Sequence, residues 1–161
     1  NADWVELSIL VEEAWRAVAP PRVLRGEGAS AKTPRTARAA RVTTDAKVAR
    51  EALARLSEIC LALPDVQCER EARHATFRAR NKKVFAYFLD NHHGDGKVAV
   101  CLKGDRRENA RLVEASPDRF YSPAYIGSRG YLGVRLDTRR VDWKDVAVRV
   151  DASYRAATRG R

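Results

Sequence analysis

The sequence predicts an α+β fold in which a small antiparallel sheet is flanked by helices, preceded by an extra N-terminal helix and a basic linker. Apolar residues recur at helical spacing in some segments, and β-favouring residues form short runs in others. These segments follow one another as helix, antiparallel strands, helix, strand and helix, which is typical of α+β proteins. The 161 residues suit one domain with additional chain, and the 45% apolar content excludes a wholly disordered protein.

The first helix of the domain is predicted over residues 44–63. Thr44 or Asp45 can cap its start, because a side-chain oxygen there accepts hydrogen bonds from the free backbone amides of the first turn. Pro64 ends it. Its apolar face consists of residues three or four apart, namely Val48, Ala52, Leu56, Ile59 and Leu63.

A β-hairpin is predicted next, with strands over 75–80 and 82–89 that meet around Asn81. The strand-favouring residues of this hairpin are Phe77, Val84, Tyr87 and Phe88. A turn over 91–96 follows, in which Gly96 is expected to take a positive φ angle, and it leads into a third strand over 97–103.

A short helix over 105–116 is predicted to begin at a cap on Asp105 and to end before Pro117. Residues 119–130 are rich in aromatic residues, glycine and proline and predict a loop. A strand over 131–137 and a closing helix over 141–158 complete the domain. One side of that helix carries Val146, Val150 and Tyr154.

The net charge is +10, from 31 lysines and arginines against 21 aspartates and glutamates. A basic balance of this size suits a polyanionic partner, with nucleic acid as the first candidate. Eight of the basic residues lie within 22–50, and residues 21–43 are predicted to be a flexible basic linker. This linker is either a tether or an arm that lies along phosphates.

The two ends of the chain resemble each other. Residues 2–17 align without gaps onto 141–156, and both segments have an aspartate followed by a tryptophan at their second and third positions. We interpret residues 1–20 as the closing helix of a preceding copy of the domain, in a tandem-repeat parent. The absence of methionine and the start at Asn1 agree with a fragment or a processed chain. This helix is expected to pack on its own domain or on a neighbouring copy.

Several segments follow in the order typical of the MmcQ/YjbR family: LSEICLALPDV, HATFRARNKKVFAYF, NHHGDGKVAVCLKG and DRFYSPAYIGSRGYLGVRLD. Residues 44–158 therefore resemble one domain of that family, and AYIGSRGYLGVRL is the most specific part. Ser128 departs from it, since histidine is common there, and so does the stretch 69–72. The resemblance implies a fold similar to a double-wing DNA-binding domain, and it implies no enzymatic activity.

A nucleic-acid-binding role requires cations that meet phosphates, together with groups that approach the bases. The hairpin and the aromatic loop are predicted to form a two-winged DNA-binding surface on the sheet. Phe77 is expected to face inward, while Thr76 and Arg78 share the outer face. The residues predicted to contact nucleic acid are Arg78, Arg80, Lys82, Lys83, Arg119, Tyr125, Arg129 and Tyr131.

Other chemistries receive less support from the sequence. His92 and His93 suit a hairpin turn better than a metal site, and the sequence has no P-loop, dinucleotide-binding fingerprint, G-x-S-x-G or H-E-x-x-H motif. We therefore expect a non-enzymatic protein without metal or cofactor. The alternative function is small-molecule or drug binding, of the resistance type, in a pocket bordered by Tyr121, Tyr125 and Tyr131. A hydrolase or transferase that uses His74, His92 or His93 ranks last.

The cellular setting is predicted from the cysteines and the hydropathy pattern. Three cysteines cannot all pair within the chain, and no secretory signal precedes them, which favours reduced thiols and a cytoplasmic protein. No apolar run approaches the roughly 18 residues that a membrane helix needs. A membrane is therefore not an expected partner. The basic charge makes DNA the expected one.

Overall fold

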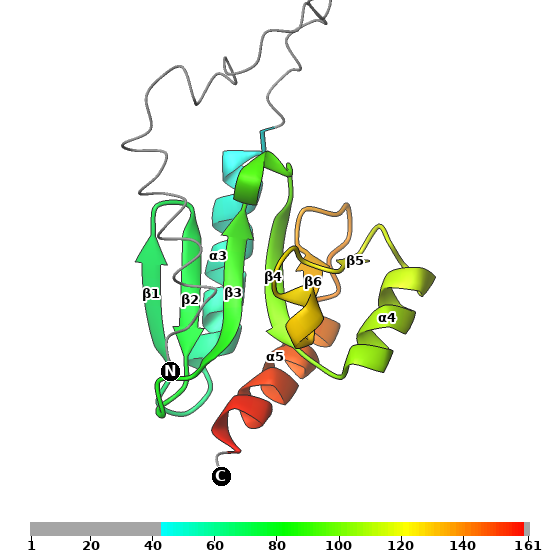
Figure 1. The fold of residues 1–161 in the computed structure, drawn as a ribbon. Helices are drawn as coiled ribbons and strands as arrows, with labels where there is room; N and C mark the ends of the chain where they lie inside the picture. The colour runs from blue at the N-terminus through cyan, green and yellow to red at the C-terminus, as the bar shows by residue number, and fades with distance from the viewer. Residues whose placement is uncertain (1–42, 160–161) are drawn as a thin grey trace, which may run out of the picture. The chain divides into compact units, whose positions relative to one another are not determined.

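The computed structural model describes residues 43–159 and has the predicted α+β fold, with one six-stranded antiparallel sheet in the order β1-β2-β3-β4-β6-β5 (Figure 1). Its elements are α3 (Ala46–Leu61), β1 (Gln67–Glu71), β2 (His74–Arg78), β3 (Val84–Asp90), η1 (His92–Gly94), β4 (Val98–Lys103), α4 (Arg106–Ala115), β5 (Phe120–Tyr121), η2 (Gly127–Arg129), β6 (Tyr131–Arg135) and α5 (Trp143–Thr158). The predicted helix over 1–20 and most of the predicted linker over 21–43 lie outside the described residues.

Each of the three α-helices within residues 43–159 begins at an aspartate that caps its first turn. The carboxylate of Asp45 accepts hydrogen bonds from the backbone amides of Lys47 (2.7 Å) and Val48 (3.3 Å). Asp105 and Asp142 cap α4 and α5 in the same way. A side-chain acceptor at this position satisfies amides that have no partner within the helix. The start of such a helix can therefore be predicted from the neighbouring residues alone.

The predicted hairpin is confirmed as β2 and β3, and the predicted third strand as β4. Two strands were not predicted. The edge strand β1 consists of Gln-Cys-Glu-Arg-Glu, and four of its five residues are exposed, so it has no apolar alternation to reveal it. The short strand β5 lies inside the predicted loop over 119–130 and pairs with β6. Both segments are strands because they pair with a neighbouring strand, β1 with β2 and β5 with β6.

The helices α3 and α5 pack on one face of the sheet, and the main hydrophobic core lies between (Figure 1). The register places Phe77 opposite Ala86, and both side chains point toward these helices and are fully buried. On the predicted apolar face of α3, Ala52 and Leu56 are buried, and Ile59 and Leu63 are partly buried against the core. Strand β3 is buried at all seven positions, so both of its faces are covered.

The buried Ser153 hydroxyl of α5 connects this helix to two strands. Its Oγ donates a hydrogen bond to the carbonyl of Phe85 (2.6 Å) and accepts one from the backbone amide of Lys103 (3.0 Å). The paired register of β3 and β4 ends at Ala86 opposite Leu102, so Ser153 bridges the next position along the ladder. The side chain is completely buried, and without it these two backbone groups would lack this partner.

None of the α-helices in the described part of the chain combines the length and the apolar content that crossing a membrane requires. The longest described helices, α3 and α5, have 16 residues each and carry several charged side chains. Their apolar faces are instead buried against the sheet.

We predict that Ser153→Ala lowers the free energy of unfolding by about 2 kcal/mol, because it leaves the buried Phe85 carbonyl and the part-buried Lys103 amide without this partner. Urea denaturation followed by circular dichroism measures the change. Ser128→Ala is the matched control, since that hydroxyl is exposed, and its effect should stay within about 0.5 kcal/mol. Equal losses in the two variants would contradict the role assigned to Ser153.

Candidate nucleic-acid interface

Three segments meet at one end of the sheet. Arg78 pairs with Val84, so the turn over 79–83 lies at this end, and Lys103 pairs with Tyr131, which brings the end of β4 and the start of β6 there. In Figure 1 this is the lower end of the sheet, where α4 also begins. The opposite end carries η1 and the first residues of β5 and α5.

The corner between β4 and α4 is fastened to η2 through the carbonyl of Gly130. This oxygen accepts hydrogen bonds from the backbone amide of Gly104 (2.9 Å) and from the Asn109 side chain (3.0 Å). Gly130 has a φ angle of +88°, and a β-carbon there would lie 3.2 Å from the carbonyl oxygen of Gly104. A glycine is therefore favoured both by the backbone angle and by the close approach of the two segments.

Exposed cations gather on these segments, and we call them the basic end: Lys82, Lys83, Lys103, Arg106, Arg107 and Arg129. None of them takes part in the ion pairs that the structure shows within residues 43–159. The neighbouring acids are engaged elsewhere: Asp105 caps α4, and Glu108 lies 3.8 Å from Arg149. The basic end therefore keeps its positive charge.

The two arginines of the predicted hairpin lie near this end but are paired with carboxylates. Arg78 donates from Nε to Glu69 (3.1 Å) and from Nη1 to the carbonyl of Lys82 (3.3 Å), and its side chain is only 13% exposed. Arg80 lies in the turn, 3.7 Å from Asp65, and is 83% exposed. An ion pair as exposed as that of Arg80 is weak, whereas Arg78 is held in place by two contacts.

Arg119 and Tyr125 lie away from the basic end. Arg119 precedes β5, stacks over the ring of Phe120 and lies 3.4 Å from Asp145 at the start of α5. The exposed Tyr125 ring lies 6.1 Å from that of His93, next to η1 at the opposite end of the sheet. The predicted residues thus do not form one surface. One group lies together at the basic end, namely Lys82, Lys83, Arg129 and Tyr131. Arg119 and Tyr125 are separated from that group.

The three tyrosines that were expected to border one pocket are also dispersed. Tyr121 lies flat against Gly133, where an added β-carbon would come within 2.3 Å of the Tyr121 ring. The Tyr121 hydroxyl lies 3.9 Å from the sulfur of Cys101. Tyr131 packs on Tyr87 with the ring centroids 5.8 Å apart. Of the three, Tyr131 alone borders the cavity beside α4 that is described below.

The cysteines and histidines of residues 43–159 lie in different environments: Cys60 and Cys101 are buried, and Cys68 is partly exposed. Burial raises the pKa of both the Cys60 and the Cys101 thiol to about 12, so neither is a thiolate near neutral pH. The described part of the chain contains no group of three or more metal-binding side chains. His92 and His93 form the turn between β3 and β4, where His93 has a φ angle of 56°.

His74 is a half-buried histidine near this turn. Its Nδ1 accepts a hydrogen bond from the backbone amide of Asp90 (3.3 Å), and its ring lies edge-on to His92 at 5.3 Å. Burial lowers the pKa of His74, while the nearby Asp90 and Glu71 carboxylates act in the opposite direction and Arg73 adds to the lowering. Protonation at Nδ1 would remove its acceptor, so the folded state favours the neutral ring.

The sequence predicted no binding role for three members of the basic end: Lys103, Arg106 and Arg107. The signal that could have found them is the Asp105 cap, because it predicts a helix start directly after a strand and therefore places two arginines beside the strand end. Their proximity to Arg129 could not be predicted, because it depends on the bonds to Gly130.

We predict that the free energy of unfolding falls as the pH drops below about 6.5, and that His74→Asn reduces this fall. The unfolded histidine takes up a proton at its ordinary pKa of 6.5, whereas the folded ring resists protonation, so stability is complete above that pH and is lost below it. The asparagine oxygen can still accept from the Asp90 amide. Urea denaturation between about pH 7.5 and 5 measures both proteins, and identical pH profiles would contradict the prediction.

Comparison with known proteins agrees with the resemblance seen in the sequence. The YjbR family model matches residues 61–156. The crystal structure of the Deinococcus radiodurans protein DR2400, which has a DUF419 domain, is similar with a TM-score of 0.53 and 18% identity, over 65% of this chain and 76% of that one, and at this identity it supports the fold alone. No curated protein matches the chain. Because the family model spans more than half of the sequence, the chain belongs to the YjbR family.

Proposed function

We propose that this YjbR domain is a non-enzymatic nucleic-acid-binding protein, and that its basic end holds the phosphates of DNA. The observation that supports this function is the set of six exposed cations that three separate segments bring to one end of the sheet, none of which forms an ion pair with another residue of 43–159. Unpaired cations release condensed counterions from DNA when they bind, and this release drives association.

The dimensions of the basic end suit successive phosphates. Neighbouring strands lie about 4.8 Å apart, so Lys83 before β3, Lys103 at the end of β4 and Arg129 before β6 are spread over roughly 10 Å. The charges along one DNA strand are about 3.4 Å apart along the helix axis, and long lysine and arginine side chains can adjust to that spacing.

The contacts that this surface offers are to the backbone of DNA rather than to its bases. Phosphate contacts position a protein on the duplex and carry no direct sequence information. Arg107 and Arg111 are one helical turn apart on α4 and are both exposed, so they extend the positive surface along that helix. We therefore expect binding with little sequence preference and a strong dependence on salt.

Fluorescence anisotropy of a labelled 20-base-pair duplex, measured with the full chain from about 50 to 300 mM NaCl, tests the proposal. Replacing Lys83, Lys103 and Arg129 together by glutamine should weaken binding and reduce the slope of log K against log salt by about 2.7, since each lost phosphate contact contributes about 0.9. The matched control replaces Lys47, Arg55 and Lys144, which removes the same charge from α3 and α5, away from the basic end.

The control variant should retain most of the slope of the wild-type protein. Equal loss of affinity in the two triple variants, or a wild-type affinity that does not respond to salt, would refute the proposal. A third variant with Lys32, Arg35 and Arg38 changed to glutamine distinguishes the two interpretations of the basic linker. A reduced slope in that variant indicates an arm along the phosphates, and an unchanged slope indicates a tether.

A further inference from the structure

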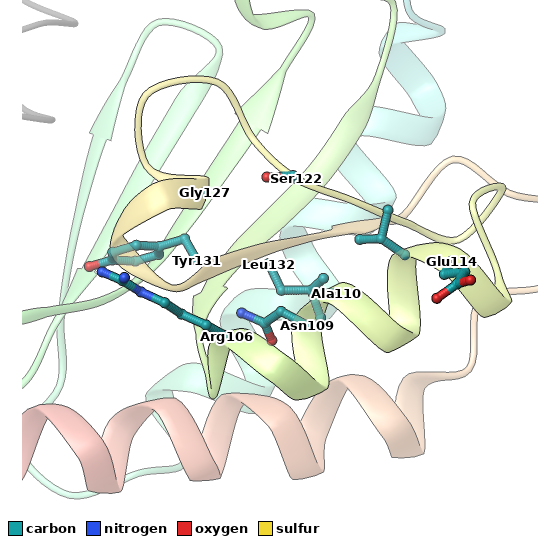
Figure 2. Close-up of a pocket in the computed structure, with 9 residues that line it drawn as sticks. Arg106, Asn109, Ala110, Glu114, Ser122, Gly127, Tyr131 and Leu132 are labelled. Atoms are coloured by element: carbon teal, nitrogen blue, oxygen red, sulfur yellow. The ribbon is translucent and has the colours of Figure 1, made fainter.

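A cavity of about 400 Å³ lies between α4 and the segment from β5 to β6 (Figure 2). One wall is the face of α4 that carries Arg106, Ala110 and Glu114, four residues apart. The other wall consists of Ser122 and Gly127 with Tyr131 and Leu132 at the start of β6. Its volume falls within the range of 300–1,000 Å³ that is usual for small-molecule sites in proteins.

The cavity exists because the residues around its middle are small. Ala110 leaves α4 without a large side chain at this point, and none of the residues of α4 is fully buried. Gly127 packs so closely on Ser122 that an added β-carbon would lie 2.2 Å from the Ser122 hydroxyl oxygen. The bond from Asn109 to the Gly130 carbonyl holds α4 against η2, so the two walls keep their separation without a ligand.

The two ends of the cavity differ in charge. Figure 2 shows Arg106 extending toward the end of the cavity where Tyr131 lies, and Glu114 at the other end of the same helix face. Eight residues separate them along α4, which corresponds to about 12 Å. Between them the walls are mostly apolar, through Ala110, Leu132 and the Tyr131 ring. The guanidinium of Arg106 forms no ion pair within the described residues.

We propose that this cavity binds a small organic acid with a flat apolar body. The carboxylate of the ligand pairs with Arg106, since a guanidinium presents two parallel donors that match the two oxygens of a carboxylate. The apolar body lies between Ala110 and Leu132 and against the Tyr131 ring, where it removes apolar surface from water. Glu114 repels a second negative group, so the site favours a monoanion and disfavours a polyphosphate.

This site goes beyond the proposed DNA binding, although Arg106 belongs to both surfaces. The ligand occupies the groove behind the first turn of α4, whereas the phosphates would meet Lys83, Lys103 and Arg129. A test without DNA and a test with variants of those three residues therefore separate the two proposals.

The experiment is a titration of the ¹⁵N-labelled full chain with 2-naphthoate and, separately, with the neutral 2-naphthamide, followed by amide chemical shifts. We expect saturable shifts at Ala110, Gly127 and Leu132, and a Kd about tenfold lower for the acid than for the amide. Arg106→Gln should raise the Kd of the acid about tenfold and leave that of the amide unchanged. Arg107→Gln, which removes the neighbouring charge outside the cavity, is the matched control and should retain wild-type binding.

A second pair of variants tests the cavity itself. Ala110→Phe fills the space between the walls and should abolish binding of both compounds, whereas Ala115→Phe adds the same ring to α4 outside the cavity and should not. Both positions are exposed, so the fold should survive, and circular dichroism verifies this. The proposal would be refuted if the acid and the amide bound with equal affinity, or if Ala110→Phe bound like the wild type. It would also be refuted if neither 2-naphthoate nor benzoate gave saturable shifts up to about 10 mM.

Discussion

The Ser153 hydroxyl is the contact on which the arrangement of this domain depends. It lies where the β3–β4 ladder ends, and it bonds both to the Phe85 carbonyl and to the Lys103 amide. It therefore fixes α5 against the sheet and, at the same time, sets the position at which β4 stops. The chain turns into α4 directly after that point, so this bond lies beside the corner from which α4 begins.

The Gly130 carbonyl makes the second contact that organises this end of the sheet. By accepting from Gly104 and Asn109, it holds η2 against the β4–α4 corner. As a result, η2 and the β4–α4 corner carry exposed cations, and a cavity lies between α4 and the segment from β5 to β6. Because Arg106 is common to both, a bound acid and a bound phosphate would compete for the same guanidinium, which couples the two proposed sites.

Basic residues have two different roles in this domain. Arg78 and Arg119 are bound to carboxylates, and their hydrogen bonds and ring contacts connect neighbouring elements of the fold. Lys103 and Arg129 have no such partner in the described part of the chain and remain available to a ligand. A lysine or arginine count does not separate these roles, because pairing depends on which carboxylate the fold brings within reach.

The sequence by itself determined the features that are local in the chain. The cap of α3, expected at Thr44 or Asp45, and the cap of α4 at Asp105 follow from neighbouring residues. The same is true of the hairpin of β2 and β3 and of the turn at Gly96 with its φ angle of 68°, so these features were predicted correctly. Only the tertiary structure decided the rest. β1 and β5 exist because a partner strand pairs with them, Ser153 is buried because two strands end beside it, and Arg119 is separated from Arg129 because antiparallel pairing places them at opposite ends of the sheet. These outcomes depend on contacts between residues far apart in the chain, which no local pattern encodes.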